Sequence, residues 1–367
     1  MDLRSLLREM YECQGNKTRR MNTHGSESSA GGIMPQNLLE QLRKYSVIVV
    51  DTGDIEAMER FKPRDATTNP SHITNAAKMP KYQPILDGEL INARKELGAG
   101  SSDLEVANLA FRRLGIAWGK NILNVVPGRV STEVDARLSY DTEGTIAQAR
   151  GIIAQYEAEG ISRERILVKI AATWEGTRAA RVLEKEGIHC NLTLIFAAFQ
   201  AVAAAEAGAT LVSPFCGRVL DWYKKETGRD YFGAEDPGVI HVTAVYNYFK
   251  KYGFKTEVMG ASFWNVGQVR ELAGADLLTI APKVLAELEA IAEELTPKLN
   301  DEAARALPIE KIVVDSKETF ERLLAANRMA TDKLKEGIEG FSAALVELET
   351  LLVKRLAELE SRTATTA

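Results

Sequence analysis

The chain of 367 residues has few cysteines, no excess of basic residues and no long apolar run. Its three cysteines, Cys13, Cys190 and Cys216, are too few and too scattered for a disulfide framework or a cysteine-based zinc site. A net charge of -5, from 46 basic and 51 acidic residues, argues against nucleic acid as a principal partner. No apolar stretch approaches the roughly 18 residues of a membrane span, and the four dispersed histidines show no metal-ligand spacing. Composition therefore favours an ordinary globular protein without a metal site.

The first 34 residues differ in composition from the rest of the chain. Residues 15–33 are polar and rich in glycine and serine, which is typical of a flexible leader. Acidic residues near the start and the lack of an apolar signal core argue against a secretory signal and weaken a transit-peptide interpretation. We expect a leader over residues 1–34, one catalytic domain over residues 35–367, and a cytoplasmic location.

Strand and helix patterns alternate over the remaining sequence. Amphipathic stretches predict helices at residues 142–159, 175–186 and 237–252. Between and before them, apolar and β-branched runs predict strands at residues 46–51, 65–68, 123–134, 166–172, 190–196, 210–215, 256–262 and 277–282. Near-continuous apolar strands with helical crossovers indicate a parallel sheet covered by helices. Eight compact strand-helix units fit a closed (β/α)₈ barrel, a TIM barrel, better than an open sheet.

Further patterns refine this α/β interpretation. No glycine-rich phosphate-binding string of the GxGxxG or GxxxxGK[ST] type occurs, which argues against nucleotide-binding folds. Extra helices are expected at both ends, over residues 37–44 and 317–360, and the apolar stretch 194–205 predicts a buried helix. Leucines at three- and four-residue steps in the last segment predict a helix that caps the barrel, with a homodimer contact as the alternative.

A lysine interrupts the apolar run of the fourth predicted strand. Lys169 lies between Val168 and Ile170, where a charged side chain is costly to bury. Burial favours a neutral amine, and a neutral amine attacks carbonyl groups to form a Schiff base. The alternative is a lysine at a strand end that reaches solvent or pairs with a carboxylate.

Two carboxylates end other predicted strands. Asp51 follows the first apolar run, where it is either a general acid/base at the barrel mouth or the N-cap of a helix beginning near Ile55. Glu133 ends the third run, and its alternative is a salt bridge with Arg129 or Arg137. A lysine and two carboxylates on separate strands, without a metal or cofactor signal, meet the needs of a Schiff-base aldolase.

Polar side chains also follow the remaining strands. Asn69 precedes a proline and is either a site residue or a turn residue. Asn191 and Thr193 share one face of the fifth strand and would point into the barrel. Their buried amide and hydroxyl need partners, which are either a substrate or ordered water, or other groups inside the barrel.

Late strands of such barrels are often followed by phosphate-binding loops. Ser213, Arg218 and Ser262 follow the sixth and seventh predicted strands. The planar fork of Arg218 suits a phosphate, and the alternative is a surface ion pair with Asp221 or Glu226.

The sequence resembles the transaldolases, class I aldolases of the pentose phosphate pathway, over roughly residues 36–360. The resemblance is carried by the strings VVDTGD, ATTNPS, VPGRVSTEVDARLSYD, ILVKIAATWEG, CNLTLIF, VSPFCGRVLDW, VMGASFWN and LTIAPK. It implies an (α/β)₈ barrel that needs neither metal nor organic cofactor. It also implies transfer of a dihydroxyacetone unit from sedoheptulose 7-phosphate or fructose 6-phosphate to an aldose phosphate.

The resemblance assigns chemical roles by matching position. Lys169 corresponds to the Schiff-base lysine and Asp51 to the residue that moves the proton of the substrate C4 hydroxyl. Glu133 corresponds to the acid/base that assists carbinolamine formation and dehydration through a water molecule, which Thr193 positions.

Binding roles follow in the same way. The donor hydroxyls would be held by Thr68, Asn69 and Asn191, with Ser213 close to the bound carbon skeleton. Phe215 would be the aromatic side chain that shields the intermediate from water.

One position departs from the family pattern. Arg218 and Ser262 are expected to hold the phosphate, but the arginine usual after GASF is replaced by Trp264. An altered phosphate preference is therefore one alternative to ordinary transaldolase activity. A barrel that binds sugar phosphate without catalysis is another, although Lys169, Asp51 and Glu133 are all present.

Overall fold

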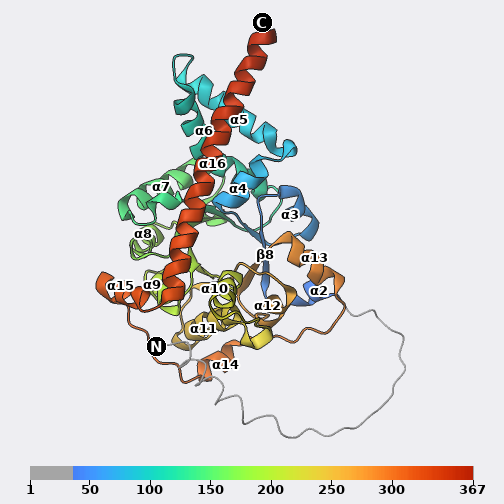
Figure 1. Cartoon of the computed structure of the whole chain (residues 1–367), viewed down its shortest axis with the longest axis vertical. Helices are drawn as coiled ribbons and strands as arrows, with labels where there is room; N and C mark the ends of the chain where they lie inside the picture. Colours follow the sequence, from blue (N-terminus) through green and yellow to red (C-terminus); the bar gives the residue numbers. More distant parts are fainter. Residues whose placement is uncertain (1–35, 367) are drawn as a thin grey trace, which may run out of the picture. The chain divides into compact units, whose positions relative to one another are not determined.

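The computed structural model describes residues 36–366, so the predicted leader over residues 1–34 lies outside the described residues. In this part of the chain, eight parallel strands form a closed barrel in chain order (Figure 1). They are β1 Val47–Asp51, β2 Asp65–Thr67, β3 Val130–Glu133, β4 Ile166–Ala171, β5 Cys190–Ile195, β6 Leu211–Pro214, β7 Glu257–Gly260 and β8 Leu277–Ile280. The predicted (β/α)₈ barrel is confirmed.

Helices surround the barrel and extend it at both ends. The first group comprises α2 Leu38–Leu42, α3 Ile55–Phe61, α4 Pro70–Ala77, α5 Gln83–Leu97, α6 Asp103–Leu123, α7 Thr142–Ala158, α8 Trp174–Lys185 and α9 Ala198–Glu206. The second comprises α10 Gly217–Thr227, α11 Pro237–Tyr252, α12 Val266–Glu271, α13 Pro282–Ala290, α14 Asp301–Ala306, α15 Lys317–Ala325 and α16 Arg328–Thr366. None of the helices in residues 36–366 is long and apolar enough to span a membrane.

Two predicted elements need correction. The apolar run 123–134 begins with the last residue of α6 and passes through a turn, so its strand starts only at Val130. The helix expected from residue 194 begins at Ala198, because residues 194 and 195 still belong to β5. Gln200 marks the boundary: its Oε1 accepts the backbone N–H groups of Phe196 and Ala197. An apolar strand running into an apolar helix has no change of periodicity to show where one ends.

The inside of the barrel changes from apolar to polar along the strands. Five inward side chains pack together as a separate apolar cluster: Val49, Leu167, Leu211, Met259 and Leu277. Because side chains alternate along a strand, the residue two positions after each of these also points into the barrel, nearer the C-terminal end of its strand. The apolar cluster closes the barrel below this end, so polar side chains that follow it line one mouth.

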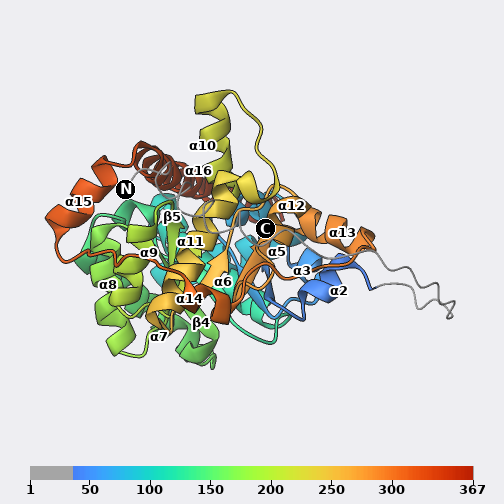
Figure 2. The same cartoon turned by 90° about the horizontal axis from the view of Figure 1, so that it is seen from below.

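The C-terminal helix α16 lies across that mouth (Figure 1) and packs against α4, α5, α6 and α10. Figure 2 shows α16 and α10 on the same side of the barrel. The leucines at positions 345, 348, 352 and 356 are buried, which confirms the prediction of a capping helix. The predicted C-terminal helix is divided, since α15 ends at Ala325 and α16 starts at Arg328.

A close contact brings α16 over β5. Leu194 has a left-handed backbone with φ of 56°, at an irregularity in the pairing of β5 with β6. A Cβ atom at Gly337 would lie 2.6 Å from Cδ2 of Leu194, so glycine permits this approach. Phe341 follows four residues later on the same face of α16 and is thereby placed above the strands.

Candidate active site

The period of two along each strand brings the candidate residues to the same mouth. Asp51 and Glu133 are the last residues of β1 and β3, and Glu133 stands in register with Lys169 of β4. Lys169 in turn pairs in register with Asn191 of β5. Residues far apart in sequence therefore face one another because their strands are neighbours.

Lys169 is buried, with 4% of its surface exposed. Its Nζ lies 3.1 Å from Oε2 of Glu133 and donates to the backbone oxygen of Thr68 at 3.0 Å. The expectation that this lysine reaches solvent is wrong, whereas pairing with a carboxylate is confirmed. The alternative of a salt bridge between Glu133 and an arginine is wrong, because Arg129 and Arg137 pair with other carboxylates.

Burial of the Lys169–Glu133 pair changes the pKa of Glu133. Burial raises the pKa of Glu133 above its usual value, although the nearby charges of Lys169 and Arg218 act in the opposite direction. A buried carboxyl group with a raised pKa can carry a proton to or from a neighbouring group, and a lysine must be neutral when it attacks a carbonyl. The pair therefore places a proton carrier 3.1 Å from the candidate nucleophile.

Asp51 lies within a hydrogen-bonded chain on the other side of the mouth. Thr67 Oγ1 donates to Asp51 Oδ1 at 2.9 Å, and Thr279 Oγ1 lies 2.6 Å from the Thr67 hydroxyl. Because Thr67 donates its single proton to Asp51, Thr279 donates to Thr67. The alternative of Asp51 as a helix N-cap is wrong, since Asp54 occupies that position before α3.

Asn69 has a structural task as well as a place at the mouth. Its Oδ1 accepts the backbone N–H of His72 at 2.9 Å and caps α4, as expected of a residue at a turn before proline. Its Nδ2 lies 3.2 Å from Nδ1 of His72, which is 3.4 Å from Asp51 Oδ1. Sequence analysis gave His72 no role, because the four histidines are far apart in the chain. The one feature of the sequence that could have indicated His72 is its position three residues after Asn69, at the start of α4.

An amide and two hydroxyls connect β3, β5 and β6. Asn191 Nδ2 donates to Ser131 Oγ at 3.0 Å, and Ser213 Oγ donates to Asn191 Oδ1 at 2.6 Å. The predicted internal bonding is therefore confirmed for Asn191. Thr193 differs, because its buried Oγ1 has no hydrogen-bond partner in the described part of the chain. A buried hydroxyl of this kind calls for a water molecule or a substrate group.

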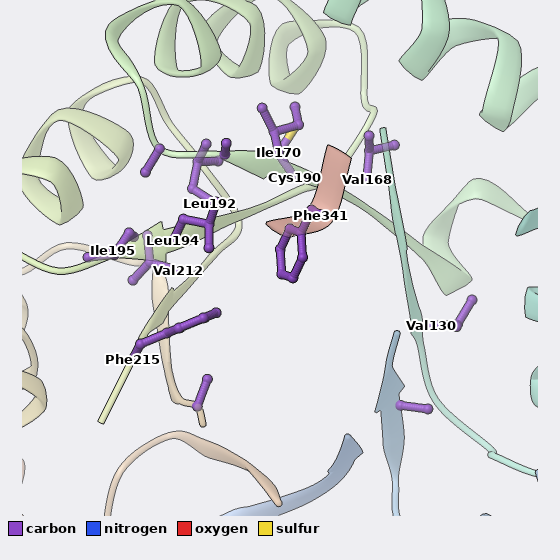
Figure 3. Close-up of a cluster of buried hydrophobic side chains, with 14 of the residues drawn as sticks. Val130, Val168, Ile170, Cys190, Leu192, Leu194, Ile195, Val212, Phe215 and Phe341 are labelled. Carbon is purple, nitrogen blue, oxygen red and sulfur yellow. The ribbon is translucent and has the colours of Figure 1, made fainter. Parts of the chain in front are cut away.

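Aromatic rings enclose Lys169 and Arg218. The Lys169 Nζ lies 5.7 Å from the centre of the Phe341 ring. The Arg218 guanidinium lies 5.4 Å from the same ring and 5.1 Å from that of Phe215. Figure 3 shows the side chain of Phe215 extending toward Phe341, while Val168 points away from them. Sequence analysis missed Phe341, since only the tertiary structure brings α16 to the mouth.

Arg218 is a cation without a counter-ion in direct contact. No hydrogen bond or ion pair joins it to another residue within 36–366, so the alternative of an ion pair with Asp221 or Glu226 is wrong. Burial lowers the pKa of Arg218 from its usual value, while Glu336 and Asp51 counteract this effect from a distance. A shielded guanidinium with free donors is suited to an anionic ligand.

Trp264 lies on the loop after β7 and contacts α10, the helix that carries Arg218. Its indole Nε1 donates to Asp221 Oδ1 at 3.0 Å, and the ring packs where a Cβ of Gly217 would otherwise stand. About half of the residue, 48%, is exposed. Ser262, two residues earlier, has a left-handed φ of 61° and a buried Oγ without a partner among the described residues. The loop thus offers one free hydroxyl but no second guanidinium.

The comparisons with known proteins agree with this geometry. Residues 48–352 match the family described as Transaldolase/Fructose-6-phosphate aldolase. A protein named Transaldolase from a Nostoc species is 64% identical over 328 residues, covering 89% of this chain and 98% of the relative.

Two further relatives carry the same name. The Transaldolase of Methylococcus capsulatus is 64% identical over 329 residues, 89% of this chain and 100% of the relative. That of a Synechocystis species is 58% identical over 329 residues, 90% of this chain and 84% of the relative. The chain belongs to the transaldolase/fructose-6-phosphate aldolase family.

Proposed function

We propose that this enzyme, a transferase of the transaldolase type, acts through a Schiff base on Lys169. It takes a dihydroxyacetone unit from sedoheptulose 7-phosphate or fructose 6-phosphate and passes it to glyceraldehyde 3-phosphate or erythrose 4-phosphate. The observation that carries the proposal is the buried Lys169–Glu133 pair, with Nζ and Oε2 3.1 Å apart. This pair places a buried amine, the candidate nucleophile, next to a carboxyl group that can carry protons.

The proton steps are divided between the two carboxylates. Glu133 assists formation and dehydration of the carbinolamine through a water molecule that Thr193 holds with its free hydroxyl. Asp51 takes the proton of the C4 hydroxyl as the carbon–carbon bond breaks and returns it to the oxygen of the acceptor aldehyde. The electron pair of the broken bond remains on the lysine-bound fragment as an enamine.

The remaining polar groups hold the donor. Thr68, Asn69 and Asn191 bind its hydroxyls, and Ser213 lies near its carbon skeleton. The aromatic rings of Phe215 and Phe341 keep water from the enamine, so that the fragment waits for the acceptor instead of being hydrolysed.

Arg218 and Ser262 bind the phosphate, which their unpartnered donors favour. We also infer that the enzyme is located in the cytoplasm, together with its charged substrates. A homodimer stays a prediction.

Borohydride trapping tests this function directly. The enzyme is incubated with fructose 6-phosphate, reduced, and examined by peptide mass spectrometry. We expect a reduced three-carbon adduct on the peptide that contains Lys169. A parallel reaction with erythrose 4-phosphate should yield sedoheptulose 7-phosphate. Binding of the donor without adduct or product would instead support a non-catalytic barrel, and an adduct without transfer would support a simple aldolase.

Trp264 favours a second candidate, the same chemistry with a weakened preference for phosphorylated sugars. Position 264 carries no charge where the family usually has an arginine, and the indole donates its N–H to the Asp221 carboxylate. One charge-assisted hydrogen bond contributes about 1.5–3 kcal/mol, or roughly ten- to a hundredfold in affinity. The ratio of activity on phosphorylated and free aldehydes separates this candidate from the first.

Trp264→Arg is expected to lower the KM for fructose 6-phosphate about tenfold, since it adds one charge-assisted contact. The new guanidinium would also meet Asp221, so the effect should be larger when Asp221→Asn is combined with it. Trp264→Gln removes the indole without adding charge and serves as the control. An unchanged KM in both the single and the double variant would mean that Arg218 already holds the phosphate.

A further inference from the structure

His72 is a histidine at the barrel mouth to which the reaction described above gives no role. It is the third residue of α4, at the C-terminal end of β2, and 28% of its side chain is exposed. Its Nδ1 faces two groups, the Asn69 amide at 3.2 Å and Asp51 Oδ1 at 3.4 Å. The charged groups that act on it are Asp51, Lys169 and Arg218.

The helix cap determines which form of the imidazole occurs. Asn69 must present Oδ1 to the backbone N–H of His72, and this turns its Nδ2, a donor, toward the ring. Nδ1 of His72 is therefore an acceptor, and the ring proton is on Nε2. Burial lowers the pKa of His72, and Lys169 and Arg218 act in the same direction while Asp51 opposes it. The imidazole is thus neutral when its lone pair faces Asp51.

A lone pair and a carboxylate oxygen attract each other only when a proton lies between them. We propose that His72 is a positioning residue for Asp51: its Nδ1 accepts the O–H of protonated Asp51 and holds that proton between cleavage and transfer. The Asn69 amide already lies within hydrogen-bond distance of Nδ1 at 3.2 Å, and Asp51 Oδ1, at 3.4 Å, needs to approach by only a few tenths of an ångström once it carries a proton. This inference rests on the proposed function, which gives Asp51 its proton.

The proton balance is complete without a further reactant. In cleavage, the C4 hydroxyl loses its proton to Asp51, its oxygen becomes the aldehyde carbonyl, and the bond pair passes to the iminium to form the enamine. In transfer, the enamine attacks the acceptor carbonyl and Asp51 returns the proton to the new hydroxyl. Between these steps the first aldehyde must leave and the second must enter. During that interval His72 gives protonated Asp51 an acceptor within the protein.

The test compares His72→Leu with His72→Asn in the transfer reaction from fructose 6-phosphate to erythrose 4-phosphate. Leucine removes the acceptor, whereas the asparagine oxygen can take the place of Nδ1. For His72→Leu we expect kcat to fall about tenfold, as for the loss of one hydrogen bond. The acidic limb of its pH–rate profile should move to lower pH, because protonated Asp51 has lost stabilisation. His72→Asn should retain both values within about threefold.

A control variant and a trapping measurement accompany this test. Asn75→Leu places the same side chain on the exposed part of α4 and controls for the substitution itself. Trapping of dihydroxyacetone on Lys169 should be unchanged in His72→Leu, since that adduct needs no proton from Asp51. A wild-type kcat and pH profile in His72→Leu, or equal losses in both variants with the acidic limb unmoved, would overturn the role of His72. Absence of transfer in the wild-type enzyme would overturn the proposed function and this inference together.

Discussion

Lys169→Ala is expected to abolish both borohydride trapping and sugar transfer. Thr68 and Glu133 hold the Lys169 Nζ at the mouth, so the substitution removes the nucleophile that this arrangement positions. Loss of the nucleophile removes the covalent route, so transfer should fall below detection. Peptide mass spectrometry after reduction with fructose 6-phosphate checks the adduct, and a coupled assay checks transfer.

Lys250→Ala is a matched control for this variant. Lys250 is a partly buried lysine that, like Lys169, pairs with a carboxylate, Asp276 at 2.6 Å. It lies before β7 rather than at the mouth, so its loss should leave the adduct in place. The folded state of Lys169→Ala is checked by thermal unfolding, since Glu133 can remain buried in its protonated form. Retained turnover in Lys169→Ala would refute the Schiff-base assignment.

Asp51→Ala is expected to separate adduct formation from carbon–carbon cleavage. Lys169 can still condense with the donor, because Glu133 serves that step, but no base remains for the C4 hydroxyl. General acid–base catalysis is worth about 10²–10⁴-fold, so cleavage should slow by that amount. Reduction with borohydride should then trap a six-carbon adduct from fructose 6-phosphate, where the wild-type enzyme gives a three-carbon adduct.

Two variants make the result for Asp51 specific. Asp51→Asn retains an acceptor for Thr67 but cannot take a proton, so it should resemble Asp51→Ala in cleavage. Asp54→Asn alters a carboxylate three residues away that pairs with Lys81, and should cleave at the wild-type rate. If Asp51→Ala forms no adduct at all, the proposed division of roles between Asp51 and Glu133 is wrong.

Much of this molecule was determined locally by its sequence. The eight apolar runs predict the barrel strands because parallel strands covered by helices must be apolar on their outer faces. A lysine inside such a run, and carboxylates at the ends of two others, stand out because burial of charge is costly. Lys169, Asp51 and Glu133 could therefore be singled out before any contact was known.

Contacts between distant segments required the tertiary structure. Sequence allowed Glu133 to pair with an arginine, and only the register of β3 with β4 places it against Lys169. Phe341 lies at the mouth because α16 crosses the barrel, a path that no local pattern specifies. His72 reaches Asp51 because the cap at Asn69 orients the first turn of α4 toward β1.

The physical reason for this division is the range of the interactions. Backbone periodicity and the cost of burying polar groups act on neighbouring residues, so the sequence by itself determined the strands and the side chains that do not belong in them. Hydrogen bonds and ring contacts extend over a few ångströms in space, whatever the separation in sequence. The tertiary structure alone decided which proton carrier meets the lysine, which ring covers it and which histidine faces Asp51.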